Sequence, residues 1–196
     1  MSQKYAAFDG TSGQILAFFD DSINSPEQIA SQKTIPITDD QWQACIDSPI
    51  PYTVDVVNLV LVAPTDAVVL AAAQAAQTGQ LTSACAVQIQ SGFQSSALGA
   101  AYLYPLDLTS QSNMQAAVIR FGITTPTPPA TINFMCADMA TMTWQRRAHT
   151  SAQIMQVALE AMGYIEAVLA KKDTLTAQVA AQTTAAAVQG IAWTFP

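Results

Sequence analysis

The stretch that decides the fold runs from Thr150 to Ala181 and reads TSAQIMQVALEAMGYIEAVLAKKDTLTAQVAA. Thr150 and Ser151 are both capping candidates, so the pattern predicts one long helix that begins here and ends at about Ala181. Alternating spacings of four and three residues mark a heptad-like seam along it, made of Ile154, Ala158, Ala161, Ile165, Val168, Lys172, Leu175 and Val179.

Further apolar residues lie beside this seam. Leu159, Met162 and Leu169 widen the apolar stripe to that of an ordinary core helix. We therefore expect the helix to pack within the chain and to hold the C-terminal half together. A self-associating coiled coil is the alternative.

Extended segments precede the long helix. Two pieces at 131–136 and 142–146 flank residues 137–140, which stand in the position of a hairpin turn. Tyr102 and Tyr104 alternate on a further predicted strand, and aromatic side chains at this spacing indicate the core face of a sheet. A ledge for stacking sugars is the alternative for these two tyrosines.

Two more helices are predicted upstream. Asp107 or Thr109 can cap one that passes through 111–119 and leads to a proline-rich loop at 124–129. The other begins at the composition change near Thr65, where strong helix formers fill 65–77. Gly79 interrupts that run. Residues 81–90 stay open between helix and strand, because their second half alternates with period two.

The first third of the chain predicts β structure with short helical pieces. The predicted elements are a hairpin of 5–9 and 14–19 around a Gly-rich turn, a helical turn opened by Ser25 and Pro26, a strand at 34–37, a helix capped by Thr38 with apolar positions 42, 45 and 46, and an extended run at 53–62.

These elements together predict an α+β fold. We expect a small N-terminal antiparallel β module with one short helix at 1–64, a connecting Ala-rich helix at 65–90, and a C-terminal α+β domain with the long helix at 91–196. A chain of 196 residues is long enough to bury a substantial core.

Charge is scarce. Charged residues make up 11% of the chain, against about 25% in an average soluble protein, so Gln, Thr, Ser and Ala must cover most of the surface. Such a surface favours protein partners. The net charge of -7 argues against nucleic acid, which needs a basic face. The longest apolar run, 56–63, is far short of the ~20 residues that span a membrane, so no membrane contact is expected.

No grouping of side chains points to catalysis, a cofactor or a metal. Cys45, Cys85 and Cys136 form no C-x-x-C pair, and we expect them to be buried thiols. No phosphate-binding glycine motif is present, and the acidic pairs at 20–21 and 39–40 lack the spacing of a calcium loop. The N-terminal segment has no apolar signal core, so cytoplasmic synthesis is expected.

The single histidine, His149, directly precedes the long helix. A hydrolase triad would depend on it alone, and no G-x-S-x-G turn supplies a nucleophile, so we predict that the protein is not an enzyme. His149 is expected to donate to a backbone carbonyl while Thr150 caps the helix. Arg146 and Arg147 are expected to pair with acids such as Asp107 or Asp138, or with carboxylates of a partner.

The order of short motifs resembles a known group of proteins. The N-terminal motifs are Tyr5-Ala-Ala-Phe8-Asp9, Ile15-Leu16 and Ile35-Pro-Ile37-Thr38-Asp39-Asp40-Gln41-Trp42, and they look like the opening module of bacteriophage tail-fibre assembly and tail-fibre-associated proteins. The later motifs resemble an uncharacterised domain of tail-fibre operons. They are Ser96-Ala-Leu-Gly99-Ala-Ala-Tyr102-x-Tyr104-Pro105, an aspartate-led segment near Asn113, Cys136-Ala-Asp138, Trp144-x-x-Arg147-x-His149-Thr150-x-x-Gln153-Ile154 and Thr184-x-x-x-Val188-Gln-x-Ile191-x-Trp193.

This resemblance implies a non-enzymatic structural protein of a phage or phage-like tail, made in the host cytoplasm and located in the virion tail. Its expected partners are other tail proteins, in the fibre or baseplate, and further copies of itself. The alternative is a tail-fibre assembly chaperone that folds or caps the fibre without remaining in the particle. The resemblance implies no catalytic, cofactor-binding or metal-binding residues.

Overall fold

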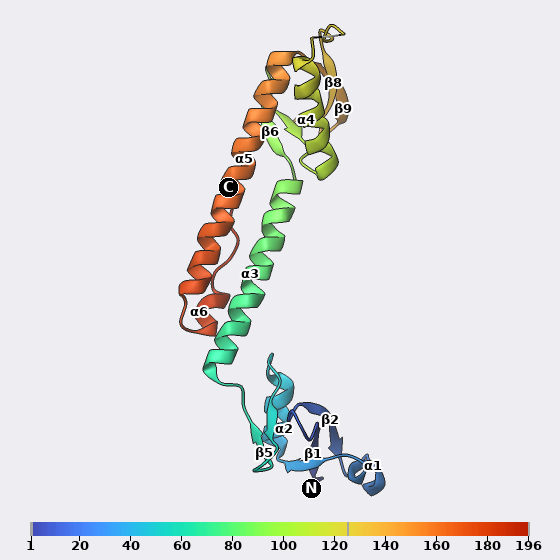
Figure 1. The fold of residues 1–196 in the computed structure, drawn as a ribbon, viewed down its shortest axis with the longest axis vertical. Helices are drawn as coiled ribbons and strands as arrows, with labels where there is room; N and C mark the ends of the chain where they lie inside the picture. The colour runs from blue at the N-terminus through green and yellow to red at the C-terminus, as the bar shows by residue number, and fades with distance from the viewer. Residues whose placement is uncertain (1, 125, 196) are drawn as a thin grey trace. The chain divides into compact units, whose positions relative to one another are not determined.

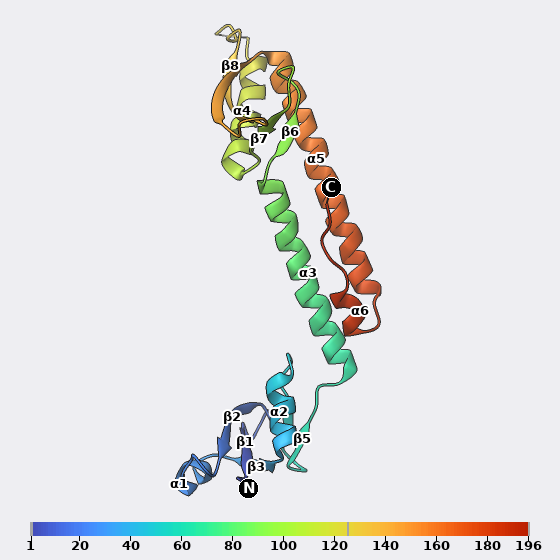
Figure 2. The same ribbon diagram turned by 180° about the vertical axis from the view of Figure 1, so that it is seen from behind.

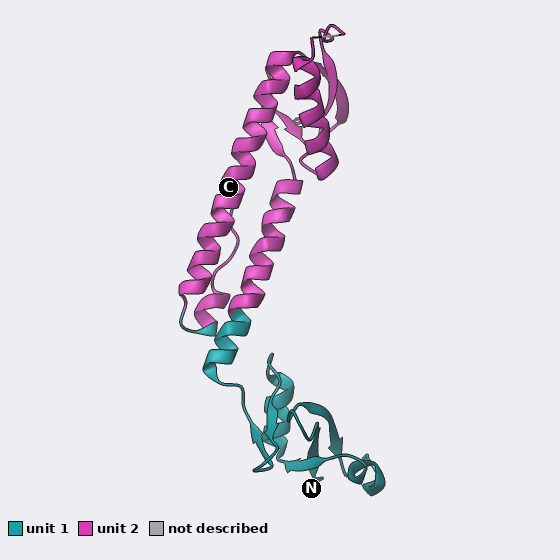
Figure 3. Cartoon of the chain, viewed as in Figure 1, with its two compact units in different colours: residues 1–73, 183–185 teal, residues 74–182, 186–196 magenta. Residues whose placement is uncertain are grey.

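The computed structural model describes residues 2–124 and 126–195 and has the predicted α+β class. The chain divides into two compact units, one of residues 1–73 and 183–185, the other of residues 74–182 and 186–196 (Figure 3). Within the described residues, no helix combines the length and the hydropathy needed to cross a bilayer.

The first unit is built on a three-stranded antiparallel sheet of order β2-β1-β3, from β1 (Lys4–Phe8), β2 (Ile15–Asp20) and β3 (Thr34–Ile37). The predicted hairpin and third strand are therefore confirmed. Gly13 closes the hairpin loop with φ +73°, and a Cβ there would collide with the carbonyl oxygen of Val54. Only glycine fits this turn without strain.

Two short helices accompany the sheet, as predicted. Ser25 and Thr38 are the N-caps of α1 (Pro26–Ala30) and α2 (Asp39–Asp47), and each forms a complete capping box with the glutamine at the third helical position. Trp42 of α2 packs against a small core of Ala6, Phe8, Ile35, Ile37 and Val54.

The expected extended run at 53–62 is instead a second hairpin, β4 (Thr53–Asp55) and β5 (Val60–Val62). Its turn forms because the Asp55 carboxylate accepts hydrogen bonds from the backbone N–H groups of Val57 and Asn58, and Leu59 takes φ +55°. The Val54 N–H donates to the Gly13 carbonyl at 2.7 Å, which joins this hairpin to the first.

The helix α3 (Asp66–Gln90) is continuous, so Gly79 does not interrupt it and the open segment 81–90 is helical. Glycine in a helix costs only about 1 kcal/mol relative to alanine, too little to break a run of strong helix formers. Leu81 and Cys85 are its buried residues.

The second unit contains a four-stranded antiparallel sheet of order β6-β7-β8-β9. Its strands are β6 (Phe93–Ser95), β7 (Tyr102–Tyr104), β8 (Ile132–Asp138) and β9 (Trp144–His149), and α4 (Leu108–Gly122) begins after the N-cap Asp107. The strands and helix predicted here are confirmed, but the turn predicted at 137–140 lies later, at 139–143, because β8 continues to Asp138. Of the predicted proline-rich loop at 124–129, Thr125 lies outside the described residues.

The long helix α5 (Ser151–Ala181) begins and ends as predicted, with Thr150 as its N-cap. Helices α4 and α5 cover one face of the sheet (Figures 1 and 2), where Met114, Ala117, Ile154, Val157 and Ala161 meet aromatic residues of the strands. Tyr104 is fully buried in this core, as its strand position predicts. The sheet and both helices therefore share one hydrophobic core.

The seam of α5 faces the interior of the chain. Its residues Ile154, Ala161, Val168, Leu175 and Val179 are buried, which confirms internal packing. The three residues beside the seam, Leu159, Met162 and Leu169, remain 63%, 57% and 39% exposed, so the expectation that they belong to the core is wrong.

Helix α3 runs alongside the second half of α5 (Figures 1 and 2). The Gln74 side-chain amide donates to the Val179 carbonyl, 105 residues later in the chain, and the Gln88 amide donates to the Tyr164 hydroxyl. After α6 (Ala185–Gln189), Ile191 accepts a hydrogen bond from the Gln77 side chain. Three glutamine side chains of α3 thus bond to the rest of the unit, beside the apolar contacts of its buried residues.

Candidate functional site

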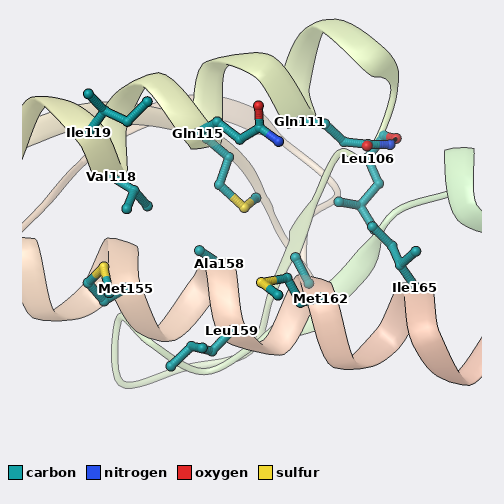
Figure 4. Close-up of a pocket in the computed structure, with 12 residues that line it drawn as sticks. Leu106, Gln111, Gln115, Val118, Ile119, Met155, Ala158, Leu159, Met162 and Ile165 are labelled. Atoms are coloured by element: carbon teal, nitrogen blue, oxygen red, sulfur yellow. Dashed lines mark hydrogen bonds between the residues drawn. The ribbon is translucent and has the colours of Figure 1, made fainter.

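An apolar groove with a volume of about 370 Å³ lies between α4 and α5. Figure 4 shows Val118 pointing from α4 toward α5, across from Met155 and Ala158. We call this surface the α4–α5 groove; it is lined by Leu106, Gln111, Met114, Gln115, Val118, Ile119, Met155, Ala158, Leu159, Ala161, Met162 and Ile165.

Four of the apolar side chains lining the groove are strongly exposed. Ile119 and Leu159 are each 63% exposed, Met162 is 57% exposed and Met155 is 43% exposed. The floor is formed by core residues such as Leu106 and Met114, so the groove is continuous with the hydrophobic core. Contiguous exposed apolar surface on a folded protein marks a site of interaction.

Chemically, the groove is suited to binding and not to orienting a reacting molecule. None of its lining residues is charged, and one of its two amides, that of Gln111, already donates to the Leu106 carbonyl at 2.7 Å. Small-molecule sites normally combine apolar walls with a few converging polar groups. Three of the chain's seven methionines line the groove, and their flexible side chains adapt well to a protein surface.

His149 lies at the end of β9, fully buried beneath α5. Its Nδ1 is 2.7 Å from the Arg147 carbonyl oxygen, which can only accept, so Nδ1–H donates and Nε2 accepts from the Tyr104 hydroxyl at 2.8 Å. The predicted bond to a backbone carbonyl and the predicted cap at Thr150 are both confirmed. Both ring nitrogens are satisfied, so the imidazole links β7 to the end of β9.

This environment predicts a pH dependence of stability. Burial lowers the pKa of His149 from 6.5, and the Arg147 carbonyl only partly opposes that shift. Below about pH 6.5, His149 therefore binds a proton in the unfolded chain but not in the folded chain. The free energy of unfolding then falls by up to about 1.4 kcal/mol for each pH unit. Above that pH the contribution is fully present.

Urea titrations of the full chain at pH 7.5 and 5.5 measure this effect, because His149 is the only histidine and free carboxylates titrate at lower pH. His149→Gln should remove the difference between the two pH values, whatever its own cost in stability. Equal pH dependence in the parent and this variant would contradict the prediction.

The cysteines only partly follow the expectation of buried thiols. Cys85 and Cys136 are buried, whereas Cys45 on the short helix α2 is only half-buried, because that helix has no fully buried residue. The three thiols are all free. Across the described residues, no group of three or more metal-ligating side chains comes together. Asp20 instead pairs with Lys4 at 2.7 Å, which lowers the pKa of that carboxyl.

The expected pairing of Arg146 and Arg147 with Asp107 or Asp138 is wrong. Over residues 2–124 and 126–195, neither arginine forms an ion pair. The Arg147 guanidinium lies over the Tyr102 ring, 4.8 Å from its centroid, and Asp107 is occupied in capping α4. The side chain of Arg146 lies on the opposite face of the sheet.

Sequence reasoning singled out Leu159 and Met162 but assigned them to the core, and it missed Met155 and Ile119 as surface residues. The helical spacing of Met155, Leu159 and Met162 shows that they share a face of α5. Nothing in the sequence shows that α4 leaves this face uncovered.

Residues 72–192 match one protein family, described as a Domain of unknown function (DUF4376). The match includes both helices of the α4–α5 groove and the whole four-stranded sheet. No curated protein and no solved structure matched the chain.

Proposed function

Since the chain belongs to the DUF4376 family, whose description assigns no function, we propose its role from its own surface and motifs. It is a non-enzymatic structural protein of a phage or phage-like tail. It is associated with the tail fibre or baseplate and acts by binding other tail proteins.

The observation that carries this proposal is the α4–α5 groove. Contact with water is unfavourable for its four most exposed apolar side chains. Burying each of these half-exposed side chains against a partner contributes about 1 kcal/mol of binding free energy. Permanent protein interfaces have apolar cores depleted in charge, which is the composition of this groove. A protein partner is the occupant that these properties favour.

The surface of helix α3 also supports a role inside an assembly. Helix α3 has 25 residues and a single charged side chain, Asp66, so most of its exposed face is alanine, glutamine and threonine. Such a face forms contacts without desolvating charges. The tail setting rests on the motif order, from Tyr5-Ala-Ala-Phe8-Asp9 to Ile191-x-Trp193, that resembles tail-fibre-associated proteins.

A tail-fibre assembly chaperone is the second candidate. Three methionines in the groove favour it, because flexible thioether side chains suit reversible contacts with more than one surface. A chaperone would use the same groove but leave the fibre after assembly.

Mass spectrometry of purified particles tests the proposal. We expect peptides of this chain at a fixed ratio to those of the fibre or baseplate proteins. Absence from particles with complete fibres, together with co-purification with the fibre protein from lysed host cells, would favour the chaperone. Absence from both preparations would contradict both functions.

A further inference from the structure

A second pocket, on the other side of α4, differs chemically from the groove. It lies between α4 and the strands β8 and β9, has a volume of about 450 Å³ and shares no lining residue with the α4–α5 groove. Polar side chains line it, among them Arg120, Arg146, Asn113 and Asn133. We call it the arginine pocket.

The charge of the arginine pocket is opposite to that of the chain. The protein has 14 acidic and 7 basic residues, yet this pocket is lined by two arginines and no acid. Neither arginine has an acidic partner among the described residues. Two unpaired guanidinium groups at one pocket create a local positive potential that attracts an anion.

Arg120 has unused hydrogen-bonding capacity. Its Nη1 is buried without a hydrogen-bond partner among the described residues, and its Nη2 makes only a long bond of 3.5 Å to the Thr127 carbonyl. Because the Nη2 bond is long and exposed, a ligand in the pocket can accept from Nη2 in its place. Guanidinium groups match the geometry of carboxylates.

An unpaired edge of strand β8 borders the arginine pocket. Strand β9 pairs with β8 from Ile132 to Ala137, but β7 pairs with β8 only at Ala137 and Asp138. Pro105 follows Tyr104 and has no N–H to continue the ladder, so the chain turns away into α4. Residues 132–135 of β8, which all line the pocket, therefore face it with one side of their backbone.

From these observations we propose that the arginine pocket binds an extended polypeptide segment of another protein that carries a carboxylate side chain. The backbone of the segment pairs with the free edge of β8, as in other cases where a peptide adds a strand to a sheet. Its carboxylate accepts hydrogen bonds from Arg120, and the positive charge of Arg146 at the same pocket adds to the attraction. This inference does not depend on the chain being a tail protein.

A peptide titration tests the proposal with the full chain. The probe is a blocked pentapeptide of threonine, valine, glutamate, valine and threonine, and its control has glutamine at the centre. In spectra of the ¹⁵N-labelled protein we expect saturable shifts of the backbone amides of residues 132–135 and of the Arg120 side chain. The glutamine peptide should bind at least fivefold more weakly.

Variants make the test specific. Arg146→Gln changes an exposed side chain and should weaken binding at least fivefold, and Arg120→Gln should do the same if its melting temperature is unchanged. Lys171→Gln removes the same charge away from the pocket and should leave the affinity within twofold.

Three results would overturn the inference. These are equal binding of the glutamine peptide, shifts confined to residues outside β8 and α4, and arginine shifts that inorganic phosphate produces but the glutamate peptide does not. The titration contains no phage particle, so a negative titration would contradict this site but not the proposed tail function. Absence of the chain from particles would contradict the tail function but not this site.

Discussion

Ile154→Ala is expected to lower the free energy of unfolding by about 2–5 kcal/mol, the usual cost of removing a fully buried aliphatic side chain. Ile154 lies in the first turn of α5 and packs in the core shared by the sheet, α4 and α5, with no exposed surface. Domains of this size have a total stability of about 5–15 kcal/mol, so the loss is a large fraction. Urea unfolding followed by far-UV circular dichroism measures it.

The same helix supplies the control. Leu159→Ala truncates a side chain of equal size that is 63% exposed, so its cost should stay near 0.5 kcal/mol, about the size of a surface substitution. If the two variants unfolded at the same urea concentration, the distinction between the core face of α5 and its groove face would be wrong.

The second large effect concerns the α4–α5 groove. We expect Leu159→Glu/Met162→Glu to reduce incorporation of the protein into particles at least tenfold. The variant loses two apolar contacts and places two carboxylates in a groove whose own lining has no basic residue to pair with them. Quantitative mass spectrometry of particles from a host that supplies the variant measures the ratio to other tail proteins.

A matched variant separates this effect from charge alone. Ala167→Glu/Thr174→Glu adds the same two charges at exposed positions of α5 that do not line the groove. It should be incorporated like the parent protein, and both variants should melt within a few degrees of it. Normal incorporation of the groove variant would show that the partner binds elsewhere.

Local chemistry explains which elements could be predicted from sequence. The start of α5 depends on a capping box in which Thr150 and Gln153 satisfy each other's backbone N–H groups, and α2 begins in the same way at Thr38. These signals lie within four residues of one another. The turn between β4 and β5 is local too, but it was hidden by the β-branched residues around Asp55, which favour an extended strand.

The candidate sites could not be predicted, because each depends on what a distant element leaves uncovered. Leu159 continues the apolar pattern of α5 and would be a core residue if α4 were placed over it. Arg120 belongs to no motif, and its unpaired Nη1 is a consequence of how α4 packs beside β8. Periodicity identifies a face of a helix, but only the packing of the whole unit decides which faces are buried.

The glutamine contacts between α3 and α5 have a consequence for synthesis. Gln74 finds its acceptor 105 residues later, and ribosomes add about 5–20 residues per second, so α3 waits roughly 5–20 seconds for its partner helix. During that time a nearly uncharged helix is free to meet other nascent chains. A lower expression level, which reduces the number of nascent chains present at once, should therefore raise the yield of correctly folded protein.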